Sequence, residues 1–159
     1  MPMEIERKFL VTHEGWRAEA LGPGLRLRQG YLPNGSAAEA PVVRVRLAGE
    51  RGFLTIKGPG LMRRAEFEYP IPVADAEAML ATLCAPPVLE KTRTRVAHAG
   101  LVWEVDEFGG LLAGLVLAEV ELEAQDQAAA LPGWIGREVT GDPRYLNSNL
   151  VRATAPPGD

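Results

Sequence analysis

The chain has 159 residues, 47% of them hydrophobic, so it is long enough to bury the core of one domain and too apolar to be disordered throughout. A formal net charge of −4 argues against a general nucleic-acid binder, which needs a basic surplus. One cysteine and two histidines exclude an internal disulfide and the common zinc sites. We find no secretory signal and no apolar run of membrane-spanning length, and we therefore expect a cytoplasmic protein.

Alternation of apolar and polar residues dominates the chain and predicts eight strands, separated by glycine-rich and proline-rich turns such as Pro33-Asn34-Gly35. The predicted strands are Glu4–Val11, Leu25–Leu32, Pro41–Leu47, Phe53–Lys57, Arg64–Ile71, Val88–Val96, Leu101–Phe108 and Leu115–Glu123. Eight strands with short turns predict a mostly β (α+β) domain that spans residues 1–153, in which an antiparallel sheet or barrel carries helices on its outside.

Four helices are predicted between or after these strands. Thr12–Ala20 has Thr12 as its N-cap, and Ala74–Leu83 is rich in helix-forming residues. Gln125–Ala130 is short, and Asp142-Pro143 predicts the start of a helix that runs to about Ala153. The proline-rich end, residues 154–159, is predicted to be a disordered tail.

Charged residues recur at every second position of the predicted strands, opposite an apolar face. In "VVRVRL" Arg44 and Arg46 share a face, whereas in "AEVELE" the shared face carries Glu119, Glu121 and Glu123. A solvated sheet face usually mixes both signs on each strand, because like charges on neighbours repel. A barrel with a charged interior explains the pattern if a polyanion neutralises the basic residues and a divalent cation neutralises the acidic ones.

The first predicted strand opens with "EIERK" at Glu4–Lys8, a Glu-x-Glu-x-Lys motif. The segments that follow it in order are "LRQGYL", "VRVRL", "LTIK", "EFEYPI", "EKTR", "WEVDEF", "LAEVELE" and "EVTGDPRYLNSNL". This ordered set resembles the CYTH, or triphosphate tunnel metalloenzyme, superfamily in its small stand-alone bacterial form, whose signature is Glu-x-Glu-x-Lys. The resemblance implies a closed eight-stranded antiparallel β-barrel, a triphosphate tunnel, that binds a small-molecule triphosphate with Mg²⁺ or Mn²⁺.

The resemblance also implies site residues. It implies metal binding by Glu4, Glu6, Glu119 and Glu121, with Glu123 a weaker match near the strand end. It implies phosphate binding by Lys8, Arg44, Arg46, Lys57, Lys91 and Arg93, and Arg95 continues the same face. Supporting carboxylates are Glu66, Glu68, Glu104 and Asp106. Lys8, Tyr31 and Glu6 are the candidates for catalysis, and Tyr31 is either near Lys8 or a core residue.

The function that these residues favour is metal-dependent hydrolysis of a triphosphate, with inorganic tripolyphosphate first, by in-line attack of water. Class IV adenylate cyclase and thiamine triphosphatase are the enzyme alternatives. In the cyclase, Trp16, Trp103 or Trp134 would stack on the base, and the alternative is that these tryptophans are packing residues. A sensor that binds polyphosphate or nucleotide without turnover is the alternative that is not an enzyme. Arg144 and Tyr145 either cap one tunnel mouth or belong to an ordinary packed helix, and a homodimer is left open.

Overall fold

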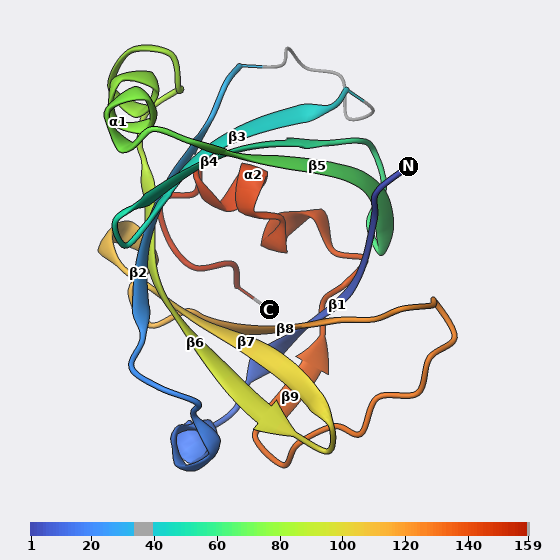
Figure 1. Cartoon of the computed structure of the whole chain (residues 1–159). Helices are drawn as coiled ribbons and strands as arrows, with labels where there is room; N and C mark the ends of the chain where they lie inside the picture. Colours follow the sequence, from blue (N-terminus) through green and yellow to red (C-terminus); the bar gives the residue numbers. More distant parts are fainter. Residues whose placement is uncertain (34–39, 159) are drawn as a thin grey trace.

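Eight antiparallel strands close into a barrel in the computed structural model, which describes residues 1–33 and 40–158 (Figure 1). The strands run in the order β5-β4-β3-β2-β6-β7-β8-β1, and β5 also pairs with β1, which closes the cylinder. Their bounds are β1 Met3–Val11, β2 Leu25–Tyr31, β3 Val42–Ala48, β4 Arg51–Lys57, β5 Arg63–Ile71, β6 Leu89–His98, β7 Leu101–Phe108 and β8 Val116–Glu121. The predicted closed antiparallel barrel is confirmed, and each predicted strand end lies within two residues of the observed one.

A ninth strand, β9 (Ile135–Glu138), was not predicted, because "IGRE" has no apolar alternation. It pairs with the edge of β1 opposite to the edge that pairs with β8, and Phe9 lies opposite Glu138 and Val11 opposite Ile135. A Cβ at Gly136 would lie 2.8 Å from the Thr12 methyl group and 3.3 Å from the Leu10 carbonyl oxygen, so glycine lets β9 approach β1 closely here.

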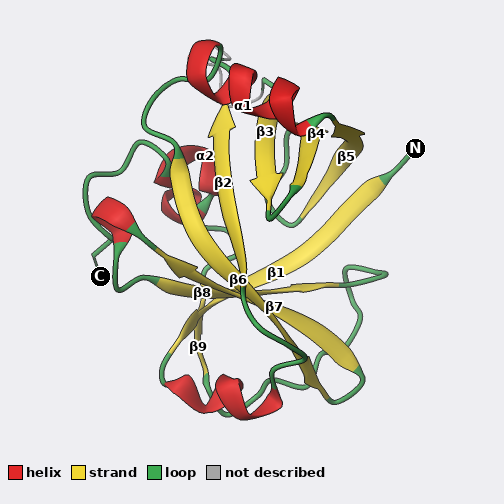
Figure 2. Ribbon diagram, turned by 60° about the vertical axis from the view of Figure 1, so that its left-hand side comes forward, coloured by secondary structure: helices red, strands yellow, loops and turns green. Residues whose placement is uncertain are grey.

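Helix α1 (Val73–Thr82) confirms the prediction for residues 74–83 and packs outside the barrel over β3 and β4 (Figure 2). It buries Ala76 and Leu80 against Val45 and Leu47 of β3. A Cβ at Gly52 would lie 3.0 Å from that of Ala76, so this glycine lets the helix approach the strand closely.

Two other predicted helices differ from the structure. Residues 14–19 form a 3₁₀ helix, η1 (Glu14–Glu19), whose N-cap is His13 and not Thr12. The Thr12 backbone N–H and hydroxyl both donate to the Trp134 carbonyl instead, which joins this corner to the β9 end. The helix predicted over residues 125–130 is wrong: Glu123 N–H donates to the Gln127 side chain at 2.6 Å, and this turn competes with helix formation.

The C-terminal segment enters the barrel and does not cover its outside (Figure 1). Asp142 is the predicted N-cap and accepts from Arg144 N–H, but the 3₁₀ helix η3 (Pro143–Tyr145) ends at once, because Leu146 is extended. Helix α2 (Asn147–Leu150) follows. A further 3₁₀ helix, η2 (Gly110–Leu112), lies between β7 and β8. The segment closes one end of the lumen, which corrects the expectation that every helix lies outside.

The interior of the barrel is divided into an apolar half and a charged half. In the apolar half, Tyr145 and Leu150 pack against inward-facing residues of the strands, namely Leu89, Phe108 and Leu117. A second core lies on the outer face, where Trp103 and Trp134 stack edge to face at 5.9 Å. The charged half is left open as the pocket described below.

The boundary predicted between the domain and its tail at residue 153 stays a prediction. The turn predicted at residues 33–35 falls partly outside the described residues. None of the helices in the described ranges is long and apolar enough to span a membrane.

Candidate active site

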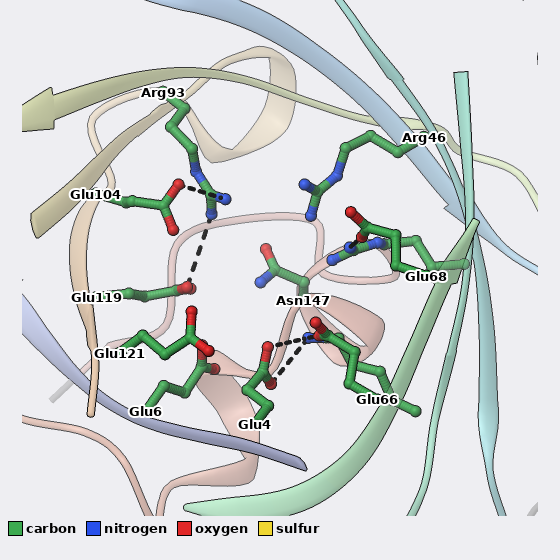
Figure 3. Close-up of a pocket in the computed structure, with 12 residues that line it drawn as sticks. Glu4, Glu6, Arg46, Glu66, Glu68, Arg93, Glu104, Glu119, Glu121 and Asn147 are labelled. Carbon is green, nitrogen blue, oxygen red and sulfur yellow. Dashed lines mark hydrogen bonds and ion pairs between the residues drawn. The ribbon is translucent and has the colours of Figure 1, made fainter. Parts of the chain in front are cut away.

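The open half of the lumen forms a cavity of about 210 Å³ with an almost entirely ionisable wall (Figure 3). Seven glutamates, four basic residues and one asparagine line it: Glu4, Glu6, Glu66, Glu68, Glu104, Glu119, Glu121, Arg44, Arg46, Lys57, Arg93 and Asn147. With every side chain ionised, the formal charge of the lining is −3. A polyanion would therefore meet repulsion on balance unless a cation accompanied it.

The alternation of strand side chains places these residues together. Side chains two positions apart in a strand lie on the same face of the sheet. The inward face therefore carries both Glu4 and Glu6 on β1, and both Glu119 and Glu121 on β8. The registers set Glu6 directly opposite Glu121, and Glu104 on β7 opposite Glu119. Like charges in directly opposed positions destabilise a sheet, so these pairs are costly in the absence of a cation.

One side of the pocket is an ion-paired cluster around Glu4. Lys57 Nζ lies 3.1 Å from both Glu4 and Glu66, and Arg64 Nε lies 3.3 Å from Glu4. Burial alone would raise the pKa of Glu4, but the hydrogen bond with Glu66 and the charges of Lys57 and Arg64 lower it to about 2. Burial and the same hydrogen bond raise the pKa of Glu66 to about 6.

A second cluster is centred on Arg93. Its Nε and Nη2 donate to the two oxygens of Asp106 at 2.7 and 2.8 Å, a bidentate pair that fixes the guanidinium plane. Arg93 also lies 3.2 Å from Glu104 and 3.7 Å from Glu119. Burial opposes ionisation of Glu119, but Lys8, Arg93 and Lys91 hold the pKa of this carboxyl well below its usual value.

Arg46 differs from the other basic residues of the pocket, because it forms no ion pair with any described residue. Burial, and then repulsion by Arg44 and Arg93, lower its pKa to about 10. Arg44 is held by the Thr55 hydroxyl at 3.2 Å and by Glu68 at 3.3 Å, yet the Nε groups of both arginines are buried without a described acceptor. These orphaned donors and the unneutralised charge favour a bound anion beside Arg46.

Glu6 and Glu121 are the acidic counterparts of Arg46, since neither forms an ion pair with a described residue. Burial and the charges of Glu119 and Glu4 raise the pKa of Glu6 to about 8. Burial, with repulsion from Glu4 and Glu104, also raises the pKa of Glu121. A cation bound between these two opposed carboxylates would remove their mutual repulsion and favour their ionised forms.

The predicted site residues fall into three groups. All four predicted metal ligands line the pocket, as do Arg44, Arg46, Lys57 and Arg93 of the predicted phosphate binders. The supporting carboxylates Glu66, Glu68 and Glu104 line it too. The remaining predicted residues lie beneath the pocket or outside it.

Lys8, Lys91 and Asp106 lie beneath the lining. Lys91 Nζ lies 2.8 Å from Asp106, and its side chain is 0% exposed. Burial lowers the pKa of Lys91 to about 7, and the Asp106 charge opposes the shift. Lys8 Nζ lies 3.4 Å from Glu119 and donates to the Tyr145 carbonyl at 2.9 Å. Each lysine therefore contacts a carboxylate of the barrel wall and a residue of the C-terminal segment, which is Tyr145 for Lys8 and Asn147 for Lys91.

Of the two positions that the sequence left open for Tyr31, the structure shows the packed one and not the one near Lys8. Its hydroxyl accepts a hydrogen bond from Gln29 Nε2 at 3.0 Å, its ring packs on the apolar half of the lumen, and no contact with Lys8 is present among the described residues. Gln29 is completely buried and its Oε1 has no described partner.

Two predicted positions lie away from the pocket. Arg95 has the parity of Arg93, but it is exposed near the end of β6, where Leu21 N–H donates to its carbonyl. Glu123 lies beyond the end of β8 and is exposed. The tryptophans are buried in the outer core, so they are not available to stack on a base.

The carboxylates fit a hard divalent cation in a particular way. Among the described residues, no three acidic, histidine or cysteine side chains are already grouped as ligands around one point. Mg²⁺ usually takes only one or two carboxylates and completes its shell with phosphate oxygens and water. The opposed Glu6 and Glu121 meet that requirement when a phosphate substrate supplies the remaining oxygens.

Sequence reasoning missed several residues that shape the site. Arg64 and Thr55 have the correct parity, so alternation indicates them, but no motif marks their roles. Gln29 lies within the quoted "LRQGYL" motif. Asn147 comes from the C-terminal segment, and no strand pattern predicts that it reaches the pocket.

A closed antiparallel barrel with a pocket of opposed carboxylates and arginines defines the class of protein: a tunnel-forming barrel whose charged interior fits a polyanion together with a cation. The CYTH domain family model matches residues 2–154, and the chain belongs to the CYTH family.

Named relatives agree with this assignment. An inorganic triphosphatase of Acetivibrio thermocellus is 47% identical over 153 residues, which cover 96% of this chain and 95% of the relative. An inorganic triphosphatase of Nitrosomonas europaea is 40% identical over 152 residues, which cover 93% of this chain and 96% of the relative.

Solved structures share the fold. The crystal structure of the inorganic triphosphatase NE1496 superposes with a TM-score of 0.67 at 37% identity, and covers 96% of this chain and 97% of that one. A putative adenylate cyclase from Bacillus halodurans is 17% identical with a TM-score of 0.61, and covers 79% of this chain and 84% of that one. At that identity the likeness extends to the fold alone.

Proposed function

We propose that this chain is a triphosphatase that hydrolyses inorganic tripolyphosphate to pyrophosphate and orthophosphate. One observation carries the proposal: Arg46 and the opposed Glu6 and Glu121 line the same pocket, and none of the three forms an ion pair with a described residue. A polyanion would neutralise Arg46, and a divalent cation would neutralise Glu6 and Glu121. A polyphosphate with its bound metal ion supplies both charges. The names of the relatives support the same substrate.

The basic residues bind and orient the substrate. Arg46 and Arg44 offer guanidinium donors to phosphate oxygens, and Arg93 is held in one plane by Asp106. Lys57, which lies between Glu4 and Glu66, contributes a compact charge of fixed position. These residues hold the triphosphate in line with an attacking water, and positioning and charge neutralisation are most of what phosphoryl transfer requires.

Mg²⁺ or Mn²⁺ would be held by the acidic residues Glu6 and Glu121, together with Glu119 and Glu4. The bound ion supplies neutralisation of charge on the phosphoryl oxygens. Glu4 and Glu119 stay ionised through their basic partners, so they also keep Lys57 and Arg93 in place.

Water attacks the terminal phosphorus, the bridging P–O bond breaks and its electrons leave with pyrophosphate, and the proton lost by the water passes to solvent. The carboxylates of the pocket orient the water. Tyr31 remains the candidate for acid–base assistance, with its oxygen fixed by Gln29.

The pocket does not favour a nucleotide. Its twelve lining residues include no aromatic or aliphatic side chain, and an adenine or thiazole ring would lie against charged groups. We therefore place inorganic tripolyphosphate before ATP and thiamine triphosphate.

The test is release of phosphate from a panel of tripolyphosphate, ATP, thiamine triphosphate and pyrophosphate, each with Mg²⁺, with Mn²⁺ and with EDTA. We expect rapid metal-dependent release from tripolyphosphate, and its loss in Glu6→Gln. Glu123→Gln, the same change at an exposed glutamate outside the pocket, is the matched control and should retain full activity. Binding of tripolyphosphate without turnover would indicate a sensor, and cyclic AMP formed from ATP would indicate a cyclase.

A further inference from the structure

The C-terminal segment supplies one residue of the pocket wall, Asn147, and that residue has no assigned role. Tyr145 and Leu150, on either side of it, are 2% and 1% exposed and pack in the apolar half of the lumen. The Tyr145 carbonyl accepts from Lys8 at 2.9 Å, which ties the segment to β1. Asn147 is therefore anchored on both sides, at the place where the apolar half meets the charged half.

The orientation of the Asn147 amide follows from its neighbour. Lys91 Nζ lies 3.2 Å from Asn147 Oδ1. An ammonium group only donates hydrogen bonds, so the oxygen of the amide must face it and the NH₂ group must face elsewhere. Asn147 Nδ2 has no acceptor among the described residues. In Figure 3 the Asn147 amide is drawn near the centre of the pocket, below Arg93 and Arg46 and beside Glu119.

A neutral donor has a specific use in this pocket. Its eleven other lining residues are ionisable, and Lys91 directly below is already paired with Asp106 at 2.8 Å. An amide can bind a phosphoryl oxygen without adding a charge and without a protonation equilibrium of its own. Lys91 polarises the amide through Oδ1, which strengthens donation from Nδ2.

We propose that Asn147 is a substrate-binding residue, whose Nδ2 donates to a phosphoryl oxygen at the inner end of the bound tripolyphosphate while its Oδ1 stays on Lys91. The inference rests on the proposed function for the identity of the ligand. It makes the C-terminal segment part of substrate recognition as well as the closure of the barrel.

The experiment measures binding of a methylene-bridged, non-hydrolysable tripolyphosphate analogue in Mg²⁺ by isothermal titration, with KM and kcat for tripolyphosphate alongside. Asn147→Ala should weaken binding of the analogue roughly ten- to a hundredfold, the range for a lost hydrogen bond to a charged group, and should raise KM more than it lowers kcat. Asn147→Asp keeps an oxygen for Lys91 but repels phosphate, and should bind more weakly still with an unchanged melting temperature.

Two variants of the same helix serve as controls. Ser148→Ala changes the adjacent residue, which makes no side-chain hydrogen bond among those described. Asn149→Ala removes the donation from Asn149 Nδ2 to the Pro143 carbonyl at 2.8 Å, and so loosens the segment without touching the pocket. Both should bind the analogue within about twofold of the unmodified protein.

The proposal is overturned if Asn147→Ala binds the analogue as tightly as the unmodified protein, or if Asn149→Ala loses as much affinity. Should Asn147→Ala fail to fold, Asn147→Asp decides alone, because unchanged affinity there is incompatible with a phosphate contact. An unmodified protein that binds the analogue but releases no phosphate refutes the proposed hydrolysis and leaves the Asn147 comparison valid. An unmodified protein that does not bind the analogue refutes both.

Discussion

Glu6 gives the sharpest test of whether the pocket is built for a cation, because its carboxyl destabilises the metal-free fold. Its pKa is raised from 4.5 to about 8 by burial and by the charges of Glu119 and Glu4. A carboxyl with a raised pKa in the folded state holds a proton that the unfolded chain releases. The stability of the folded protein therefore falls as pH rises from about 4.5 to about 8.

The magnitude follows from the size of that shift. At 1.36 kcal/mol for each pKa unit, the full shift corresponds to an upper limit of about 5 kcal/mol. Water in the open pocket and movement of the side chains reduce the effect, and we expect about 2–3 kcal/mol at pH 8.5. Glu6→Gln keeps the shape of the side chain and cannot ionise, so in EDTA it should be more stable than the unmodified protein by that amount at pH 8.5 and equal to it near pH 4.5.

The assay is urea unfolding of both proteins in EDTA at half-unit intervals from pH 4.5 to pH 9. The difference in unfolding free energy should rise with pH, with a slope no steeper than 1.36 kcal/mol per pH unit, which is the limit for a single proton. Glu123→Gln should show no such rise. Addition of Mg²⁺ at pH 8.5 should stabilise the unmodified protein more than Glu6→Gln. A free-energy difference that stays flat across this range would refute the electrostatic reasoning.

Three further predictions concern single residues. Arg46→Gln should lower kcat/KM for tripolyphosphate about a hundredfold. It should not lower the melting temperature in EDTA, because the arginine has no described ion-pair partner. Arg51→Gln, at an exposed position on β4, is the control, and normal activity in Arg46→Gln would contradict the anion site. Tyr31→Phe should lower kcat roughly a hundredfold with little change in KM if the hydroxyl assists proton transfer, and an unchanged kcat would reduce Tyr31 to a packing residue. Ala99→Gly should raise the melting temperature by about 2–4 °C, because Ala99 has a φ of 49° in the turn between β6 and β7, and a lower melting temperature would contradict the strain assigned there.

The barrel could be predicted from the sequence because its signal is local. Each strand alternates charged and apolar residues, and the resemblance of the ordered motifs supplies the closure that alternation alone does not give. β9 was missed because Gly136 interrupts any alternation of polar and apolar residues. The position of β9 also depends on contacts with β1, which is far away in the sequence.

Parity predicts which side chains face the lumen, but it does not predict how deep they lie. Lys8 and Arg46 both face inward, yet Lys8 lies beneath the lining and contacts the C-terminal segment, whereas Arg46 reaches the cavity. Depth depends on strand tilt and on what fills the other end of the barrel. For the same reason Arg95, two residues after Arg93, lies outside the pocket.

Asn147 could not be predicted from the strands at all. The sequence correctly predicts Asp142 as a helix N-cap, but the extended backbone at Leu146 breaks the helix and turns α2 into the lumen. That turn results from packing of Tyr145 and Leu150 with strand residues far away in the sequence, and no local pattern encodes it.

The most direct test of the account is a crystal structure with Mn²⁺ and the methylene-bridged tripolyphosphate analogue, with the metal located by its anomalous scattering. We expect Mn²⁺ between the carboxylates of Glu6 and Glu121, with phosphate oxygens within hydrogen-bonding distance of Arg46. Manganese bound elsewhere on the protein, or an analogue that lies outside the barrel, would contradict it.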